Sequence, residues 1–247
     1  MKEFYITDDG IRLHAKLDMP VNTEKCPLVI FIHGVTGDME EEHIVAAQKT
    51  MNAAGFAVLR AEMYGHGKSG GRFEDHTLFK WISNALKVTE YARKLDFVTD
   101  LYITGHSQGG LLAMIIAGMR PDDFKAAVLL SPAVNIPEDA RKGSFLGIAF
   151  DPDHIPEEVD LKGTKLKGNY LRAAQMIHVE DPIRAMKRPV LIIHGDADET
   201  IDIKHAFYAA GLYENCRLVI IPGDTHCYDH YPEKMTEALQ EFLQEMK

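Results

Sequence analysis

The chain has 247 residues, of which 46% are hydrophobic and 26% are charged, and its formal net charge is −10 at pH 7. These values are ordinary for a globular protein and exclude a mainly disordered chain or a coiled coil. The acidic balance argues against nucleic acid as a partner, because phosphate backbones are bound by clustered basic side chains. Since α/β folds of about 250 residues often form one domain, we expect a single domain over residues 1–247.

The N-terminus and the cysteines both point to the cytoplasm. Residues 1–20 carry charges throughout and contain no long apolar stretch, so they predict neither a signal peptide nor a membrane anchor. Cys26, Cys216 and Cys227 are odd in number and lack CxxC spacing, which predicts free thiols instead of disulfides or a zinc site. We therefore expect a cytoplasmic protein without a membrane partner.

Short apolar runs alternate with helical patterns along the chain. Residues 11–19 alternate like an exposed hairpin strand. Continuous apolar runs predict strands buried on both faces at 28–32, 57–61, 101–104, 126–130, 190–194 and 217–221. Amphipathic or apolar patterns predict helices at 40–55, 77–95, 109–119, 204–212 and 232–246. This alternation predicts an α/β fold with a mostly parallel central sheet and helices on both faces.

One region breaks the alternation. Residues 132–188 separate two predicted buried strands and contain no strong apolar run of their own. Loops of that length in compact domains are usually functional. We expect this inserted segment to form a lid over one end of the sheet.

The stretch GHSQGG, residues 105–110, lies between a predicted strand and a predicted helix. A G-x-S-x-G sequence in that position is typical of a nucleophile elbow, in which glycines permit a strained turn that exposes the serine. Other strand ends are followed by HGVTG, GDADET and PGDTHCYDH, and the carboxyl ends of parallel strands meet at one rim of the sheet. Ser107 is therefore the candidate nucleophile.

A serine hydroxyl needs a base and an acid that orients the base, and in this fold they follow in the order Ser, Asp or Glu, His. Asp198 and His226 follow the last two predicted strands in that order. We expect His226 to accept the proton of Ser107 and Asp198 to orient the imidazole. The backbone N–H groups of Gln108 and Val35 are the expected oxyanion donors.

Several neighbours offer alternative roles. Asp196 could replace Asp198, although its place beside Gly195 is more typical of a turn residue. Cys227 could suggest a thiol nucleophile, but no elbow surrounds it. Four histidines near the strand ends could suggest a metal site: His33, His66, His106 and His194. No pair of them has the helical spacing of a motif such as HExxH, so we expect these histidines to brace loops. We expect no metal and no cofactor.

Seven stretches spread over nearly the whole chain resemble the bacterial cinnamoyl (feruloyl) esterases of the α/β-hydrolase superfamily. They are HGVTG, YGHGKSGGRFE, GHSQGG, DPDHIP, GNYLRAAQ, HGDADET and GDTHCY. DPDHIP and GNYLRAAQ, which lie in the inserted segment, are the more specific. The resemblance implies an α/β-hydrolase fold and hydrolysis of ferulate, caffeate or p-coumarate esters through an acyl-enzyme intermediate.

The resemblance also implies that Asp139 and Tyr170 meet the ring hydroxyl of the aromatic acid. The alternative is that Asp139 caps a short helix and Tyr170 packs inside the lid. A position that some relatives fill with glutamine falls at Leu146. Apolar residues of the same segment could line an aromatic pocket or form the lid's own core.

Other functions share the same triad. The main alternative is a broader short-chain acyl esterase or monoacylglycerol lipase, whose lid would admit a flexible chain. A non-catalytic binding member of the fold is a third reading, which intact candidates at 107, 198 and 226 disfavour. The expected partner is a small aromatic ester, and a homodimer is left open.

Overall fold

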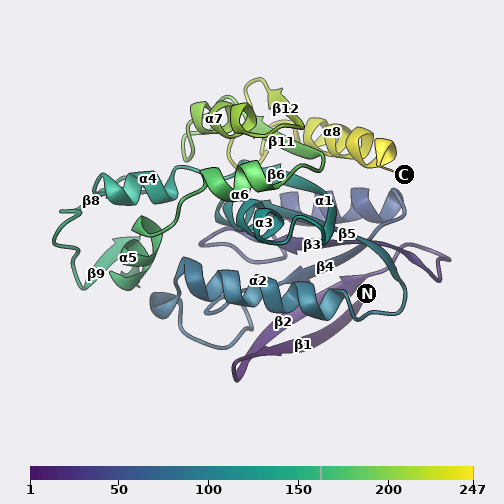
Figure 1. Cartoon of the computed structure of the whole chain (residues 1–247), viewed down its shortest axis with the longest axis horizontal. Coiled ribbons are helices and arrows are strands. Elements are labelled where there is room, and N and C mark those ends of the chain that lie inside the picture. Colours follow the sequence, from purple (N-terminus) through teal and green to yellow (C-terminus); the bar gives the residue numbers. More distant parts are fainter. Residues whose placement is uncertain (162, 247) are drawn as a thin grey trace.

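A twisted sheet of eight strands runs through the molecule, which is described by a computed structural model for residues 1–161 and 163–246 (Figure 1). The strand order is β1-β2-β4-β3-β5-β6-β11-β12. β2 is antiparallel to both β1 and β4, and the other neighbours are parallel, which confirms the predicted mostly parallel sheet. The strands are β1 (Lys2–Asp8), β2 (Ile11–Asp18), β3 (Cys26–Ile32), β4 (Ala57–Ala61), β5 (Val98–His106), β6 (Phe124–Leu130), β11 (Val190–Gly195) and β12 (Cys216–Ile221).

Helices cover both faces of the sheet. On one face, α1 packs beside α8 over a small apolar core. On the other face, α2, α3, α6 and α7 cover a larger core. Their bounds are α1 (Glu42–Ala53), α2 (Leu78–Ala92), α3 (Gln108–Met119), α6 (Glu180–Ala185), α7 (Lys204–Leu212) and α8 (Pro232–Glu245), with a 3-10 turn η1 (Phe73–Asp75) before α2.

Two central helices differ in how their sequences meet the core. α2 begins after Thr77, whose side chain accepts the N–H of Lys80, and it buries one stripe that includes Trp81 and Val88. α3 is apolar on all sides and almost wholly buried, as expected for a helix enclosed between the sheet and its neighbours. α3 starts at the candidate nucleophile, so its burial anchors that turn.

Two strands are buried to a different degree than their sequences predict. β2 was expected to be exposed, but it lies inside the sheet between β1 and β4, and Leu13 and His14 are buried. β12 was expected to be buried on both faces, but it is the last strand of the sheet and most of its residues are only partly covered. Position in the sheet therefore overrides the apolar pattern of a single strand.

The inserted segment between β6 and β11 holds only short elements. α4 (Ile136–Arg141) and α5 (Asn169–Gln175) accompany two hairpins, β7 (Ser144–Phe145) with β8 (Ile148–Ala149) and β9 (Glu158–Leu161) with β10 (Thr164–Lys167). In Figure 1 α4, α5, β8 and β9 gather at the left of the sheet, whereas α6 lies against α3. Among the described residues, no helix has the length and apolar character that crossing a bilayer requires.

Candidate active site

Ser107 occupies a strained turn between β5 and α3. Its φ of 57° and ψ of −121° lie in a region that residues with a Cβ rarely adopt, at a typical cost of about 1–3 kcal/mol. The turn has no room for a side chain at either flanking glycine. A Cβ on Gly105 would lie 2.1 Å from the Gly109 carbonyl oxygen, and a Cβ on Gly109 would lie 2.1 Å from the Ile32 carbonyl oxygen. The N–H of Ser107 donates to Leu130 at 2.9 Å and fixes the turn to β6.

His226 and Asp198 come from the loops that follow β12 and β11. His226 Nδ1 lies 2.7 Å from Asp198 Oδ2, and His194 Nε2 lies 3.1 Å from the same oxygen. Asp198 Oδ1 accepts the backbone N–H groups of Thr200 and Ile201, each at 2.8 Å. Burial acts to raise the pKa of Asp198, but the hydrogen bonds from His194, His226 and Ile201 outweigh it and hold that pKa below its ordinary value. An ionised Asp198 accepts a proton-bearing Nδ1 and leaves Nε2 of His226 as a base.

The other aspartates near His226 hold the loops together. Asp196 is exposed and accepts the N–H of Gly223 at 2.6 Å, so it ties the β11 loop to the β12 loop. Asp224 is fully buried, and its Oδ1 accepts the N–H groups of Thr225 and His230 at 2.9 and 3.1 Å. The structure thus places Asp198, and not Asp196, against the imidazole. Its place close to His226 in the sequence predicts a loop carboxylate for Asp224, and its bonds to Thr225 and His230 agree with that role.

Two histidines brace the loop after β3 that carries the predicted oxyanion donor Val35. His33 Nδ1 donates to the Gly34 carbonyl at 2.7 Å, and its Nε2 accepts the N–H of Met63 at 3.0 Å. Burial lowers the pKa of His33 to about 3, which keeps the ring neutral. His66 Nε2 is hydrogen-bonded to the Val35 carbonyl. Both carbonyls of this loop are therefore held by buried rings.

Gln108 supplies the second predicted oxyanion donor. Its N–H is the first of α3, and such groups have no partner within the helix. The Gln108 side chain is fully buried and accepts the hydroxyl of Tyr170 at 2.5 Å. This link connects the inserted segment to the residue that follows the nucleophile.

A cavity of about 790 Å³ joins these groups. Volumes of 300–1,000 Å³ are typical of small-molecule sites. Ser107, His226 and Val35 line it from the strand ends, and Asp139 and Leu146 line it from the inserted segment. A neighbouring cavity of about 530 Å³ has mainly charged walls and shares lining residues with the first: Asn135, Asp139, Glu199 and Thr200.

The structure separates the two predicted ring-binding residues. Asp139 is partly exposed, lines both cavities and accepts Asn135 Nδ2 at 2.7 Å. Tyr170 has no exposed surface and does not line the cavity, and its ring packs 4.8 Å from that of Phe145 and 5.0 Å from that of His76. Leu146 lines the cavity as an apolar side chain. Asp139 can thus contact a ligand in the cavity directly, whereas the hydroxyl of Tyr170 is bonded to Gln108.

Comparisons with known proteins agree with this geometry. The sequence model of the family described as "Serine aminopeptidase, S33" matches residues 23–152. Est1E from Butyrivibrio proteoclasticus, solved with ferulic acid bound, is 59% identical, covers 98% of both chains and superposes with a TM-score of 0.97. The monoacylglycerol lipase of Mycolicibacterium smegmatis is 24% identical over 91% of this chain and 89% of its own. Alpha/beta hydrolase domain-containing protein 10 from mouse is 16% identical over the whole of both chains, with a TM-score of 0.80, and shares the fold.

Proposed function

Because this chain belongs to the serine aminopeptidase S33 family of α/β hydrolases, we propose that it is a serine carboxylesterase that cleaves esters of hydroxycinnamic acids such as ferulic acid. The 59% identity to Est1E with ferulic acid bound, over 98% of both chains, carries this proposal. The family model ends at residue 152, before most of the inserted segment that contributes Leu161 to the cavity. The family match therefore supports serine-dependent hydrolysis, and the proposed acyl group rests on the similarity to Est1E.

We propose that acylation begins when Ser107 Oγ attacks the ester carbonyl carbon. His226 Nε2 accepts the serine proton, and Asp198 stabilises the imidazolium that forms. The oxyanion receives hydrogen bonds from the N–H groups of Val35 and Gln108. When the carbon–oxygen bond to the alcohol breaks, His226 returns the proton to the leaving alkoxide, and the acyl group stays on Ser107.

Deacylation follows the same path with water as the nucleophile. His226 takes a proton from water, the hydroxide adds to the acyl carbon, and Ser107 leaves with that proton, which frees the hydroxycinnamic acid. The N–H donors at Val35 and Gln108 serve both halves of the reaction. Their backbone is held by His33, His66 and the buried start of α3, so little reorganisation is needed at each step.

We propose that residues 132–188 form the lid over the acyl group. Asp139 at the cavity wall supplies a carboxylate that accepts a phenolic hydroxyl, and Leu146 and Leu161 supply apolar surface for a flat ring. Tyr170 contributes by holding the Gln108 side chain. A ligand with an aromatic body and a polar tip fits this arrangement of groups.

Competition between ester classes tests the proposal. The purified protein is assayed on methyl ferulate, p-nitrophenyl butyrate and a monoacylglycerol, beside the Ser107→Ala variant. We expect strong preference for methyl ferulate and loss of all three activities in the variant. Preference for the butyrate or the monoacylglycerol would leave the triad intact and overturn the aromatic acyl group.

Location and assembly are further predictions. We propose a cytoplasmic enzyme, and the free thiols of Cys26, Cys216 and Cys227 support a reducing compartment. Activity found chiefly in the medium of intact cells would contradict this location. The molar mass of the purified protein, measured by light scattering after size-exclusion chromatography, decides between a monomer and a homodimer.

A further inference from the structure

The catalytic cavity continues into the charged cavity of about 530 Å³. The walls of the charged cavity come from α4 with the residues beside it, and from the segment that joins β11 to α7. Four residues line both cavities: Asn135, Asp139, Glu199 and Thr200. The first two belong to the inserted segment, and the other two belong to the loop after β11. The cavities therefore meet at a wall that these two parts of the chain share.

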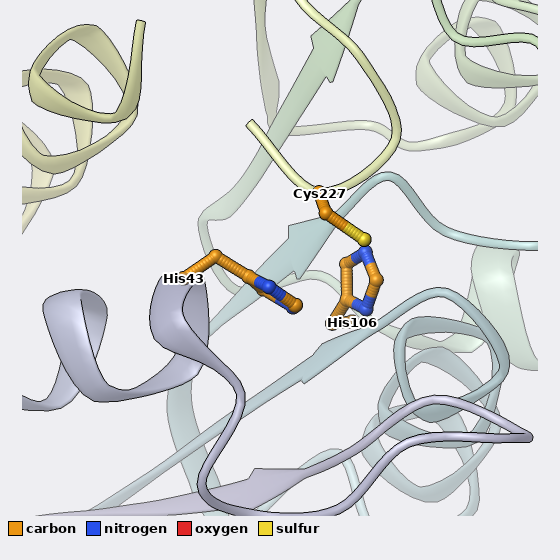
Figure 2. Close-up of side chains that lie close together, drawn as sticks. All are labelled: His43, His106 and Cys227. Atoms are coloured by element: carbon orange, nitrogen blue, oxygen red, sulfur yellow. The ribbon is translucent and has the colours of Figure 1, made fainter. Parts of the chain in front are cut away.

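The charged cavity adjoins the part of the catalytic cavity that is proposed to hold the aromatic ring. Asp139, which is proposed to meet the ring hydroxyl, lines both cavities. His106 and Cys227 line the catalytic cavity close to His43, as Figure 2 shows, and neither of them lines the charged cavity. The charged cavity is thus an extension of the acyl end of the site, an inference that rests on the proposed function.

Asn135 stands at the junction with an unused acceptor. The residue is only 8% exposed, and its Nδ2 donates to Asp139 Oδ2 at 2.7 Å. An ionised carboxylate can only accept, so this bond fixes which end of the amide carries the oxygen. Among the described residues, Asn135 Oδ1 has no hydrogen-bond partner although it is buried. Buried polar atoms without partners are rare in native proteins, and a hydroxyl group of a ligand would supply the missing donor.

The charges of this cavity favour a neutral ligand that donates hydrogen bonds. Six carboxylate side chains line it against two lysines. Both lysines are already in ion pairs, Lys142 with Glu138 at 3.0 Å and Lys204 with Asp202 at 2.9 Å. The excess of carboxylates repels an anion, whereas the same oxygens accept hydrogen bonds from hydroxyl groups. A sugar is neutral and rich in such donors.

We propose that the charged cavity is a subsite for a sugar attached to the ring oxygen of the hydroxycinnamic acid, so that the enzyme also cleaves esters of glycosylated hydroxycinnamates. The ring oxygen para to the side chain lies at the end of the acid farthest from the ester. A group attached there continues past Asp139 into the charged cavity. The glycosylated oxygen has no proton for Asp139, and hydroxyl groups of the sugar replace it as donors to Asp139 and Asn135. The ester bond is cleaved as before, and the glycosidic bond stays intact.

The methyl ester of ferulic acid 4-O-glucoside tests the subsite in the wild-type protein. We expect its kcat/KM to be at least about one tenth of that of methyl ferulate. A smaller value would show that the acyl end is closed behind the ring and overturns the subsite, while rapid cleavage of methyl ferulate leaves the proposed function standing. If methyl ferulate itself is cleaved more slowly than p-nitrophenyl butyrate, the proposed function fails and the subsite fails with it.

The matching glucuronide tests the charge of the walls, because it differs from the glucoside by one carboxylate. We expect its kcat/KM to be about tenfold lower than that of the glucoside. High salt should reduce the difference, since it screens the repulsion between partly exposed charges. Equal values at low salt would mean that the sugar lies in open solvent, which contradicts the subsite.

A bulky side chain at Ile203 should block the subsite alone, because Ile203 lines the charged cavity and not the catalytic cavity. In Ile203→Trp, we expect kcat/KM for the glucoside to fall about tenfold relative to that for methyl ferulate. The matched control Ile203→Leu keeps the volume of the side chain and should keep the ratio. A ratio that Ile203→Trp leaves unchanged overturns the proposal.

Calorimetry on the Ser107→Ala protein tests the role of Asn135 without turnover. Adding Asn135→Leu, which removes the acceptor at similar size, should weaken the binding of ferulic acid 4-O-glucoside by about fivefold. The control ligand is 3,4-dimethoxycinnamic acid, whose ring oxygens carry no proton, and its Kd should not change. An unchanged Kd for the glucoside, or equal weakening of both acids, contradicts the subsite. If a variant misfolds, the comparison of glucoside with glucuronide in the wild type still decides.

Discussion

The strand-end loops and the inserted segment 132–188 meet at one cavity but are stabilised differently. The loops after β3, β11 and β12 are held by buried groups such as His33, Asp198 and Asp224, which bond to backbone atoms. The inserted segment carries exposed ion pairs, such as Lys165 with Glu158, and its buried apolar side chains join the larger core. Exposed pairs contribute at most about 1 kcal/mol, whereas a buried polar group left without its partner costs about 1–3 kcal/mol. We therefore expect substitutions in the strand-end loops to cost more stability and activity than substitutions in the inserted segment.

The largest effect is expected at the strand ends, in Asp198→Asn. An amide cannot hold the proton-bearing Nδ1 of His226 as a carboxylate does, so kcat should fall by about 10⁴-fold with the fold retained. Asp196→Asn is the matched control, because that carboxylate contacts the Gly223 N–H and not His226. Steady-state kinetics of both variants check the assignment. Comparable losses of kcat in the two would mean that the acid has been misassigned.

Acidification should also destabilise the part of the molecule outside the inserted segment. Burial lowers the pKa values of His33, His43 and His76 to about 3, 4 and 3 from 6.5, and all three lie outside 132–188. The unfolded chain therefore binds more protons below pH 6.5, so this stabilisation is present above that pH and is lost as the pH falls toward 3 to 4. Glu41 opposes the trend, since burial raises its pKa to about 7 and favours its protonated form in the fold.

For His33, His43, His76 and Glu41 together, the net loss of stability between pH 8 and pH 5 is expected to be about 4 kcal/mol, from about 2 kcal/mol per histidine less about 2 kcal/mol for Glu41. Burial also lowers the pKa values of His66 and His106, which adds to the loss. Urea unfolding followed by fluorescence at several pH values measures it. A free energy of unfolding that stays constant over this range would show that the buried histidines keep their ordinary affinity for protons.

Glycine substitutions test the same contrast within the backbone. Gly109→Ala would place a Cβ 2.1 Å from the Ile32 carbonyl oxygen, so we expect a loss of about 3 kcal/mol or failure to fold. Gly147, in the β7–β8 turn, has a φ of +84° and no atom within 4 Å of an added Cβ. Gly147→Ala should cost only about 1 kcal/mol, from backbone strain. Thermal unfolding of the pair gives the comparison, and equal losses would remove the distinction between the regions.

The same difference explains what the sequence could and could not predict. The succession of strands and helices along the chain, the turn at Ser107 and the loop positions of Asp198 and His226 follow from local patterns, because each functional residue lies in the turn or loop after an apolar strand. The partner of Tyr170 was not predictable, since its contact with Gln108 depends on how the inserted segment packs. The meeting of His43 with Cys227 was missed for the same reason, because α1 and the β12 loop approach only through the folded sheet.

Tyr170→Phe tests the buried side-chain hydrogen bond that joins the inserted segment to Gln108, the residue after the nucleophile. Removing the hydroxyl leaves Gln108 Oε1 buried without its donor, so we expect a loss of about 1–3 kcal/mol in stability and a lower kcat with little change in KM. Tyr213→Phe is the control, because the buried Tyr213 hydroxyl has no partner among the described residues. A raised KM for methyl ferulate with kcat unchanged would assign Tyr170 to substrate binding instead of positioning.

The smallest effect is expected on the cavity wall, where Leu146→Gln should change selectivity and leave the chemistry intact. Leu146 lines the cavity opposite the rigid strand ends, and an amide there offers a donor and an acceptor to a ring hydroxyl. One added hydrogen bond is worth about 1 kcal/mol, so the ratio of kcat/KM for methyl caffeate over methyl p-coumarate should rise by about fivefold. Leu146→Met keeps the wall apolar at similar volume and should leave the ratio unchanged. If both variants shift the ratio equally, the wall senses shape alone, and the polar contact must come from Asp139 or from outside the inserted segment.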